Sequence, residues 1–212
     1  MQNFHCNKEW LIRLTLLFLG LVIAHLGVTM FIVAELGTDC FTILVQGIAN
    51  VVGLSIGTVH VIMLCLLTVV MLVTTKGYIK AGSVVCAVCG GWIIDFFLWI
   101  NNGMISVESS FLIRLVVLLL GIVILSLGMS LVIKSDAGTG PNDLIAVILT
   151  DKLKKFQFRW VRLTCDVTFL CIGVLLGGVF GIGTAFAAIM IGPCVQYFFP
   201  KSERFVNYIL RP

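Results

Sequence analysis

Long apolar runs alternate with short polar or glycine-rich breaks along the whole chain. In the first half the long runs cover about residues 10–34, 58–75 and 78–100, and the second half repeats this plan. A helix needs about 20 apolar residues to cross a bilayer. The sequence therefore predicts six transmembrane helices.

Two shorter apolar runs lie between the long ones, at residues 40–52 and 141–151. Runs of about 10 to 14 residues suit a re-entrant or interfacial helix better than a full crossing. Each follows a glycine-rich break, at residues 33–42 and 134–143, with an acidic residue two positions before a Gly-Thr pair. These two breaks are the most unusual feature of the pattern.

The second half of the chain is a copy of the first. With an offset of 101, Arg13 aligns with Arg114, and 12 of the 26 residues in 13–38 are identical to their counterparts in 114–139. One inserted residue later changes the offset to 102. Such agreement is too high for two unrelated apolar helices and indicates a tandem duplication. We expect one transmembrane domain over residues 1–212, with repeats at about 10–100 and 111–200, a linker at 101–110 and a cytoplasmic tail at 201–212.

Lysines and arginines indicate the orientation, because cytoplasmic segments are rich in both. With six spans and a cytoplasmic N-terminus, 13 of the 14 basic residues face the cytoplasm and only Arg114 faces out. With eight spans, in which the short runs cross and the repeats are parallel, 11 of the 14 do. The six-span arrangement is favoured, and its odd number of spans per half makes the two repeats inverted.

Composition agrees with an integral membrane protein. Hydrophobic residues make up 60 % of the chain and charged residues 11 %, which leaves no soluble interpretation for 212 residues. Most of the eight cysteines lie in apolar runs, where Cys acts as a small core residue, so we expect no metal site and no cofactor. The chain has no nucleophile–base constellation and no phosphate-binding loop, so we do not expect an enzyme.

Basic and aromatic residues alternate in residues 151–162. Between two spans, this pattern predicts an anchor on an anionic cytoplasmic leaflet rather than a nucleic-acid site. The expected partners are the bilayer and a small-molecule solute, with no nucleic acid and with a homo-oligomer left open. The expected location is the plasma membrane, with both termini in the cytoplasm.

The two breaks form the candidate solute site. In the inverted arrangement the short helices enter from opposite faces and meet near the midplane, and broken helices at corresponding positions of inverted halves indicate a transporter site. Free amides at helix N-termini favour an anion or the carboxylate of a zwitterion. The predicted substrate-binding residues are Gly37, Thr38, Asp39, Gly138, Thr139, Gly140, Asn142 and Asp143. The alternative is that Asp39 and Asp143 merely cap helices in tight interfacial turns.

Ionisable residues within the predicted spans are further candidates, because they are costly in lipid. Asp95 has no basic residue within a turn and is predicted to be a carboxylate that couples solute movement to protons or faces the substrate. His60 aligns with Arg162 of the second repeat, and Asp166 lies one turn from Arg162, a spacing that also fits a structural salt bridge. His25 is expected to form a hydrogen bond between helices.

Several short motifs together resemble a known family. They are Leu36-Gly37-Thr38, Gly53-Leu54-Ser55-Ile56-Gly57-Thr58, Gly140-Pro141-Asn142-Asp143, Gly181-Ile182-Gly183-Thr184 and Ile191-Gly192-Pro193. This combination is similar to that of the YczE/YyaS/YitT group of bacterial membrane proteins, whose Gly-Pro-Trp-Asp element follows the first span. Here the element lies in the second half and has Asn in place of Trp. The resemblance covers nearly the whole chain and implies a small polytopic plasma-membrane protein of the transporter type, without a known substrate or catalytic residues to transfer.

The sequence thus predicts an all-α membrane protein of six transmembrane helices plus two short re-entrant helices, built from two tandem inverted repeats. We expect a secondary transporter for a small polar or anionic solute, with its site between the two half-helix N-termini. The alternatives are a channel of the same geometry and a non-transporting binding or accessory subunit. Saturable, ion-dependent flux would favour the transporter, and flux linear in concentration the channel.

Overall fold

A computed structural model describes residues 8–74, 79–101, 109–155 and 158–210. These residues form eight α-helices and no strand, which confirms the all-α prediction. The helices are α1 (Lys8–Ala34), α2 (Cys40–Val52), α3 (Ile56–Thr74), α4 (Ala81–Asn101), α5 (Phe111–Lys134), α6 (Pro141–Leu153), α7 (Phe158–Leu175) and α8 (Ile182–Leu210).

Helix length and composition indicate a membrane protein. Five described helices are long and apolar enough to cross a bilayer: α1, α3, α4, α5 and α8. The sixth predicted span corresponds to α7, whose 18 residues include Arg159, Arg162 and Asp166. The two predicted short helices are present as α2 and α6, with 13 residues each. Large apolar side chains such as Val73 and Trp99 are mostly exposed, as lipid contact requires.

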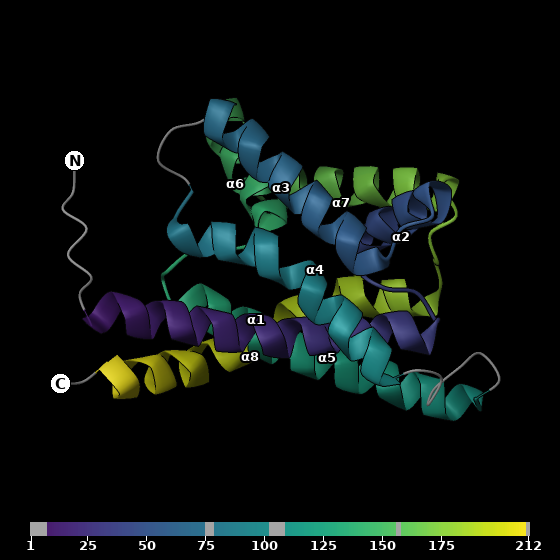
Figure 1. Cartoon of the computed structure of the whole chain (residues 1–212), viewed down its shortest axis with the longest axis horizontal. Helices are drawn as coiled ribbons and strands as arrows, with labels where there is room; N and C mark the ends of the chain where they lie inside the picture. The colour runs from purple at the N-terminus through teal and green to yellow at the C-terminus, as the bar shows by residue number, and fades with distance from the viewer. Residues whose placement is uncertain (1–7, 75–78, 102–108, 156–157, 211–212) are drawn as a thin grey trace.

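Helices α1 and α5 pack against each other and run antiparallel (Figure 1). Arg13, near the start of α1, donates a hydrogen bond of 3.2 Å to the backbone oxygen of Ser135, just after α5. Arg114, near the start of α5, donates to the backbone oxygens of Ala34 and Glu35 at 2.7 and 2.8 Å. Each arginine thereby satisfies carbonyl groups that a helix end leaves unpaired.

Glycines allow α1 and α5 to approach closely. Gly27 lies against Gly121, and Gly20 lies against Gly128. A Cβ atom on Gly128 would overlap the backbone nitrogen of Ala24, so no larger residue fits without moving a helix. Small residues at helix crossings in membranes are common because association there depends on close packing.

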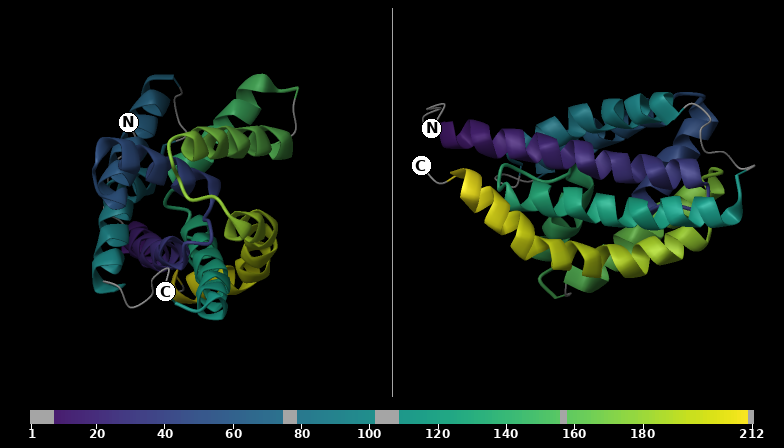
Figure 2. Two further views of the ribbon diagram at one scale, coloured as in Figure 1. Left: turned by 90° about the vertical axis from the view of Figure 1, so that its right-hand side faces the viewer. Right: turned by 90° about the horizontal axis from the view of Figure 1, so that it is seen from below.

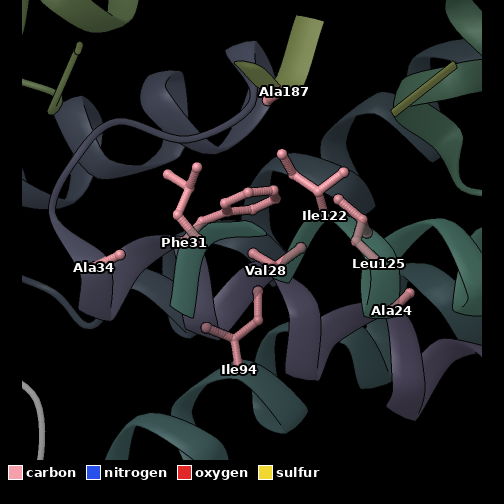
Figure 3. Packing of buried hydrophobic residues seen from close by; sticks show 9 residues of the cluster. Ala24, Val28, Phe31, Ala34, Ile94, Ile122, Leu125 and Ala187 are labelled. Atoms are coloured by element: carbon pink, nitrogen blue, oxygen red, sulfur yellow. The ribbon is translucent and has the colours of Figure 1, made fainter. Parts of the chain in front are cut away.

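The largest apolar cluster lies beside this crossing (Figure 3). It joins side chains from α1, α4, α5 and α8, because α4 packs along α1 and α8 packs along α5. Its buried members are Ala24, Val28, Phe31, Ala34, Ile94, Leu118, Ile122, Leu125 and Ala187. These four helices form the scaffold that carries the shorter elements.

The two glycine-rich breaks have the same backbone form. Glu35 and Asp136, at equivalent positions, both have positive φ, at 48° and 56°. Gly37 and Gly138 follow at φ values of 101° and 153°, where only glycine is free of steric strain. The repeated Gly-Thr pair therefore marks a required backbone turn.

Each break also hydrogen-bonds to a long helix. The backbone nitrogen of Gly82, in α4, donates to Ala137 at 3.0 Å. The backbone nitrogen of Gly183, in α8, donates to Leu36 at 2.7 Å. Gly82 and Gly183 are each the second residue of their helix, and Leu36 and Ala137 are equivalent at the offset of 101, so the two contacts are the same contact with the halves exchanged.

Both chain ends lie at one end of the molecule (Figures 1 and 2). Lys80 pairs there with Asp136 at 2.6 Å, and Lys134 with Glu203 at 2.8 Å. The hydrogen bond from Lys80 lowers the pKa of Asp136, so this carboxylate stays ionised at neutral pH. The region predicted as a tail continues α8 as helix to Leu210. Most of the predicted linker lies outside the described residues.

The two halves pack differently despite their common sequence pattern. Helix α3 lies along α4, with Gly57 against Gly91, whereas α7 makes no comparable contact with α8 among the described residues. Figure 2 shows α7 and α8 apart. Helix α2 packs along α7, with Gly47 against Gly173, but its counterpart α6 contacts α3 over a shorter stretch. Gly91 of α4 thus lies against a neighbouring helix, whereas a Cβ atom on Gly192 of α8 would meet nothing within 4 Å.

Candidate functional site

A cavity of about 160 Å³ lies where the two short helices begin. The start of α2 contributes Phe41 and Thr42 to its wall, and α1, α3, α4, α5, α7 and α8 complete the lining. Five of the eight predicted substrate-binding residues line it: Asp39, Thr139, Gly140, Asn142 and Asp143. The structure therefore brings the two breaks together around one space.

Asp39 both caps α2 and lines the cavity. Its carboxylate accepts hydrogen bonds from the backbone nitrogen of Thr42 at 3.1 Å and from the Thr42 hydroxyl at 2.7 Å. The hydroxyl of Thr38 donates to the same carboxylate at 3.3 Å. The capping interpretation is thus confirmed for Asp39, but Asp39 is also one of the residues that line the candidate site.

Helix α6 begins without a side-chain cap. Gly140 is the N-cap residue and Pro141 occupies the first turn, where the missing amide hydrogen costs nothing. Asp143 does not cap α6; it accepts a hydrogen bond of 2.7 Å from Nη1 of Arg162, in α7. The capping interpretation is therefore wrong for Asp143, whose partner Arg162 lies on another helix that also lines the cavity.

Arg162 joins two carboxylates at the edge of the cavity. Besides Asp143, its Nε donates to Oδ2 of Asp166 at 3.0 Å, which confirms the predicted salt bridge at i, i+4. All three side chains are about a third exposed, at 35, 30 and 31 %. Arg162 lines the cavity but was not among the predicted site residues. Its alignment with His60, which was predicted and also lines the cavity, was the signal that could have identified it.

A buried histidine pair, His25 and His60, lines part of the cavity. The ring of His60 lies 5.4 Å from that of His25 and 5.5 Å from that of Phe41. His60 is 6 % exposed, and its Nδ1 has no hydrogen-bond partner within the part of the chain that the structure describes. His25 bonds instead through Nδ1 to the backbone oxygen of Leu21 at 2.8 Å, so the hydrogen bond predicted between helices is wrong and lies within α1.

Three of the predicted substrate-binding residues lie behind the cavity wall. A Cβ atom on Gly37 would lie 2.6 Å from the hydroxyl of Thr184, and one on Gly138 would lie 2.5 Å from the backbone nitrogen of Ser83. Thr38 is 1 % exposed and orients Asp39. These residues position the breaks against α8 and α4.

Asp95 and Asp166 also lie outside the cavity lining. Asp166 contacts Arg162, as described above. Asp95, in α4, accepts hydrogen bonds from the hydroxyl of Ser55 and from the backbone nitrogen of Gly57 at 2.8 Å. Asp95 therefore satisfies a free amide in the first turn of α3 and ties α3 to α4.

The cavity suits a small solute with polar groups. Its charged lining residues are Asp39, Asp143 and Arg162, and its remaining lining is largely apolar. In the part of the chain that the structure describes, no three His, Cys, Asp or Glu side chains gather as metal ligands. Reversible binding of a small molecule is the chemistry that this arrangement offers.

The fold and this site define a polytopic α-helical membrane protein with two half-length helices that begin at an internal cavity. More specifically, the chain belongs to the family described as "Family of unknown function (DUF6198)", whose model matches residues 11–200.

Curated bacterial proteins are similar over most of their length. The "Uncharacterized membrane protein YczE" of Bacillus subtilis (strain 168) is 28 % identical over 203 residues, 95 % of this chain and 92 % of the relative. The "Uncharacterized protein YyaS" of the same strain is 26 % identical over 186 residues, 88 % and 92 % of the two chains. An "Uncharacterized protein" of Haemophilus influenzae (strain ATCC 51907 / DSM 11121 / KW20 / Rd) is 28 % identical over 185 residues, 87 % and 82 % of the two chains.

These matches confirm the resemblance that the motifs predict. A search of the solved structures found no match.

Proposed function

We propose that the protein is a secondary transporter that carries a small polar solute across the plasma membrane by exposing the cavity to one side at a time. The observation that carries this proposal is the position of the cavity. It lies between the first residues of α2 and α6, and these two short helices occupy equivalent places in the two halves. Transporters commonly bind solutes where discontinuous helices of two repeats meet.

The duplication is best explained as a pair of inverted repeats. Arg13 and Ser135 become Arg114 and Ala34 when the halves are exchanged, and both pairs form hydrogen bonds. The contacts of Gly82 and Gly183 with the breaks exchange in the same way. Because α1 and α5 are antiparallel, a two-fold axis that relates them would lie in the membrane plane. This supports inversion of the second repeat.

The different packing of the halves supports alternating access. Inverted repeats change the accessible side by exchanging two local conformations. Here α3 is closed on α4, whereas α7 stands apart from α8, and Arg162 and Ile191 of those two helices both line the cavity. We take this as the state that is open on the side of α7 and α8. A channel would instead need a continuous path to both sides.

The basic residues support cytoplasmic termini. Lys80 and Lys134 lie at the end of the molecule that carries both termini, and Arg114 lies at the other. The anionic leaflet would attract the basic end. With native cysteines replaced, Ser55→Cys and Ser109→Cys should react with an impermeant thiol reagent added to intact cells, and Lys201→Cys only after permeabilisation. External protection of Ser55→Cys would contradict the inverted arrangement.

The charge of the lining supports a solute without net negative charge. The sequence alone favoured a polar or anionic solute, because it placed free amides at both helix starts. The amide of Thr42 is occupied by Asp39, and the lining holds two carboxylates against one guanidinium. Of the two predicted classes, the polar solute fits better.

Flux through the purified protein tests the proposal. Proteoliposomes with an internal pH-sensitive dye should report saturable, gradient-dependent movement for one class in a panel of small amines, amino acids and carboxylates. Asp39→Asn should abolish this movement, while Asp136→Asn, which changes a carboxylate outside the cavity, should preserve it. Flux linear in concentration would instead indicate a channel, and binding without flux an accessory subunit.

A further inference from the structure

Charge around the cavity is unbalanced. Arg162 pairs with Asp143 at 2.7 Å and with Asp166 at 3.0 Å, so one guanidinium already serves two carboxylates. Asp39 has only neutral donors among the described residues, namely the two hydroxyls and one amide of Thr38 and Thr42. With these carboxylates ionised, the cavity lining has one more negative than positive charge, and Asp166 beside it adds a second. Such an excess in a half-buried site favours a bound cation.

A second, independent feature of the cavity indicates a ligand. His60 lines the cavity and is 6 % exposed, yet its Nδ1 has no partner within the described residues. A buried polar atom without a partner costs free energy, because it has lost water and gained nothing in exchange. A solute that hydrogen-bonds to Nδ1 would remove this cost. The neighbouring ring of His25 does not supply this bond, and its own Nδ1 is engaged by the backbone oxygen of Leu21.

The remaining wall indicates an organic rather than an inorganic cation. Phe41 and His60 present aromatic rings to the cavity, and cations bind favourably over aromatic faces. Apolar side chains of α1 and α5, such as Val28 and Leu125, cover much of the rest. Inorganic cations need a shell of oxygen ligands, but oxygen-bearing side chains line the cavity only at and just before the starts of α2 and α6, and the carboxylates of Asp39 and Asp143 already accept hydrogen bonds from Thr42 and Arg162. The volume of about 160 Å³ holds on the order of ten water-sized groups, enough for an amine of a few carbons.

We propose that the cavity binds a small organic cation, with Asp39 as the counter-ion of its charged head group and with the wall of Phe41 and His60 against its body. The inference rests on the proposed function only in taking this cavity as the solute site. It adds the class of the solute, namely a protonated amine with an apolar body, whose N–H groups can donate hydrogen bonds.

Melting temperatures of the detergent-purified full chain, measured at constant ionic strength, test the proposal. One carbon skeleton supplies matched probes: 3,3-dimethylbutylammonium, the neutral alcohol 3,3-dimethylbutan-1-ol and the anion 3,3-dimethylbutanoate. Methylammonium adds a smaller cation. At least one ammonium ion should raise the melting temperature with a saturable dose dependence, because a ligand that binds the folded state stabilises it. The alcohol and the carboxylate should not.

Two matched variants locate the effect. Asp39→Asn keeps the cap of α2, because Asn and Asp are equally good N-cap residues, but it removes the charge. It should lower the apparent affinity for the ammonium probe at least about tenfold. Asp136→Asn, which changes a carboxylate outside the cavity lining, should leave that affinity within about twofold of the parent.

Several outcomes would overturn the proposal. Equal stabilisation by the alcohol would show an apolar cavity without charge selection, and stronger stabilisation by the carboxylate would show an anion site. An Asp39-dependent shift with sodium ions alone would indicate an inorganic cation, and no shift with any ammonium ion would exclude the class. Binding of an ammonium ion without flux would contradict the transporter and leave this inference intact. Flux of uncharged solutes without ammonium binding would contradict this inference and leave the transporter proposal intact.

Discussion

At the scale of single residues, Arg162 is important for the electrostatics of the site because it neutralises two carboxylates. It is the partner of both Asp143 and Asp166, and it lies in α7 at the position that His60 occupies in α3. Replacing Arg162 by Gln would leave two carboxylates without a counter-charge in a partly desolvated site. Breaking a fully buried ion pair costs about 3–5 kcal/mol. Because these side chains are about a third exposed, we expect a loss of about 2 kcal/mol in unfolding free energy.

Partial rescue distinguishes this electrostatic role from a packing role. The double variant Arg162→Gln/Asp166→Asn removes one of the two stranded charges and should recover part of the loss. Thermal unfolding of the purified parent, single and double variants measures the difference. A double variant less stable than Arg162→Gln would show that the guanidinium acts mainly through its packing.

Sequence reasoning at this scale worked for local relations and failed for distant ones. The cap of Asp39 and the salt bridge of Arg162 with Asp166 depend on spacings of three and four residues, which a helix fixes. The pairing of Arg162 with Asp143 and the ring contact of His60 with His25 depend on how separate helices meet. Helix packing in a membrane depends on shape, which the apolar pattern does not specify.

At the scale of helices, the crossing of α1 and α5 depends on glycine, which gives a second prediction. Gly128→Ala would place a methyl group against the backbone of Ala24, and a backbone cannot move aside as a flexible side chain can. Overpacking of this kind costs about 1–3 kcal/mol, against about 1 kcal/mol gained from the higher helix propensity of Ala. We expect a lower melting temperature in detergent.

Gly192 supplies the matched control. It is also a helical glycine, but a Cβ atom there would meet nothing within 4 Å. Gly192→Ala should therefore keep or raise the melting temperature. Equal effects of the two substitutions would show that the α1–α5 contact is looser than the structure has it.

Helix boundaries show which helix ends the apolar pattern alone can predict. The first short helix matches its apolar run, at Cys40–Val52, because a cap begins it and Gly53 in a left-handed conformation ends it. The last helix runs ten residues beyond its predicted span, from Ile182 to Leu210, with Pro193 and Pro200 inside. Charged residues end a membrane span but not a helix. Contacts such as Ser130 with Ser202, at 2.6 Å, hold the extension in place.

At the scale of the whole molecule, the sequence predicted the duplication but not the unequal packing of its halves. Both halves carry the same apolar pattern, so the pattern is compatible with α3 closed on α4 and with α7 closed on α8. Which of the two contacts forms depends on a small difference in free energy between two similar arrangements. Two nearly equivalent packings are also what a device that alternates between two states requires.

Asp95 should stabilise the closed packing of α3 on α4, because it reaches from α4 to Ser55 and to the backbone of Gly57. Asp95→Ala removes this link and should favour the arrangement in which α3 separates from α4. With native cysteines replaced, Val59→Cys reports the change, since Val59 is 2 % exposed and packed in the cluster of α2, α3 and α4. Labelling by an impermeant thiol reagent should rise several-fold in the Asp95→Ala background. Asp136→Ala, which breaks an ion pair at the opposite end, should leave labelling unchanged. Equal labelling in all three backgrounds would reduce Asp95 to a helix cap, whereas a selective rise would make it the link that holds this side of the cavity closed.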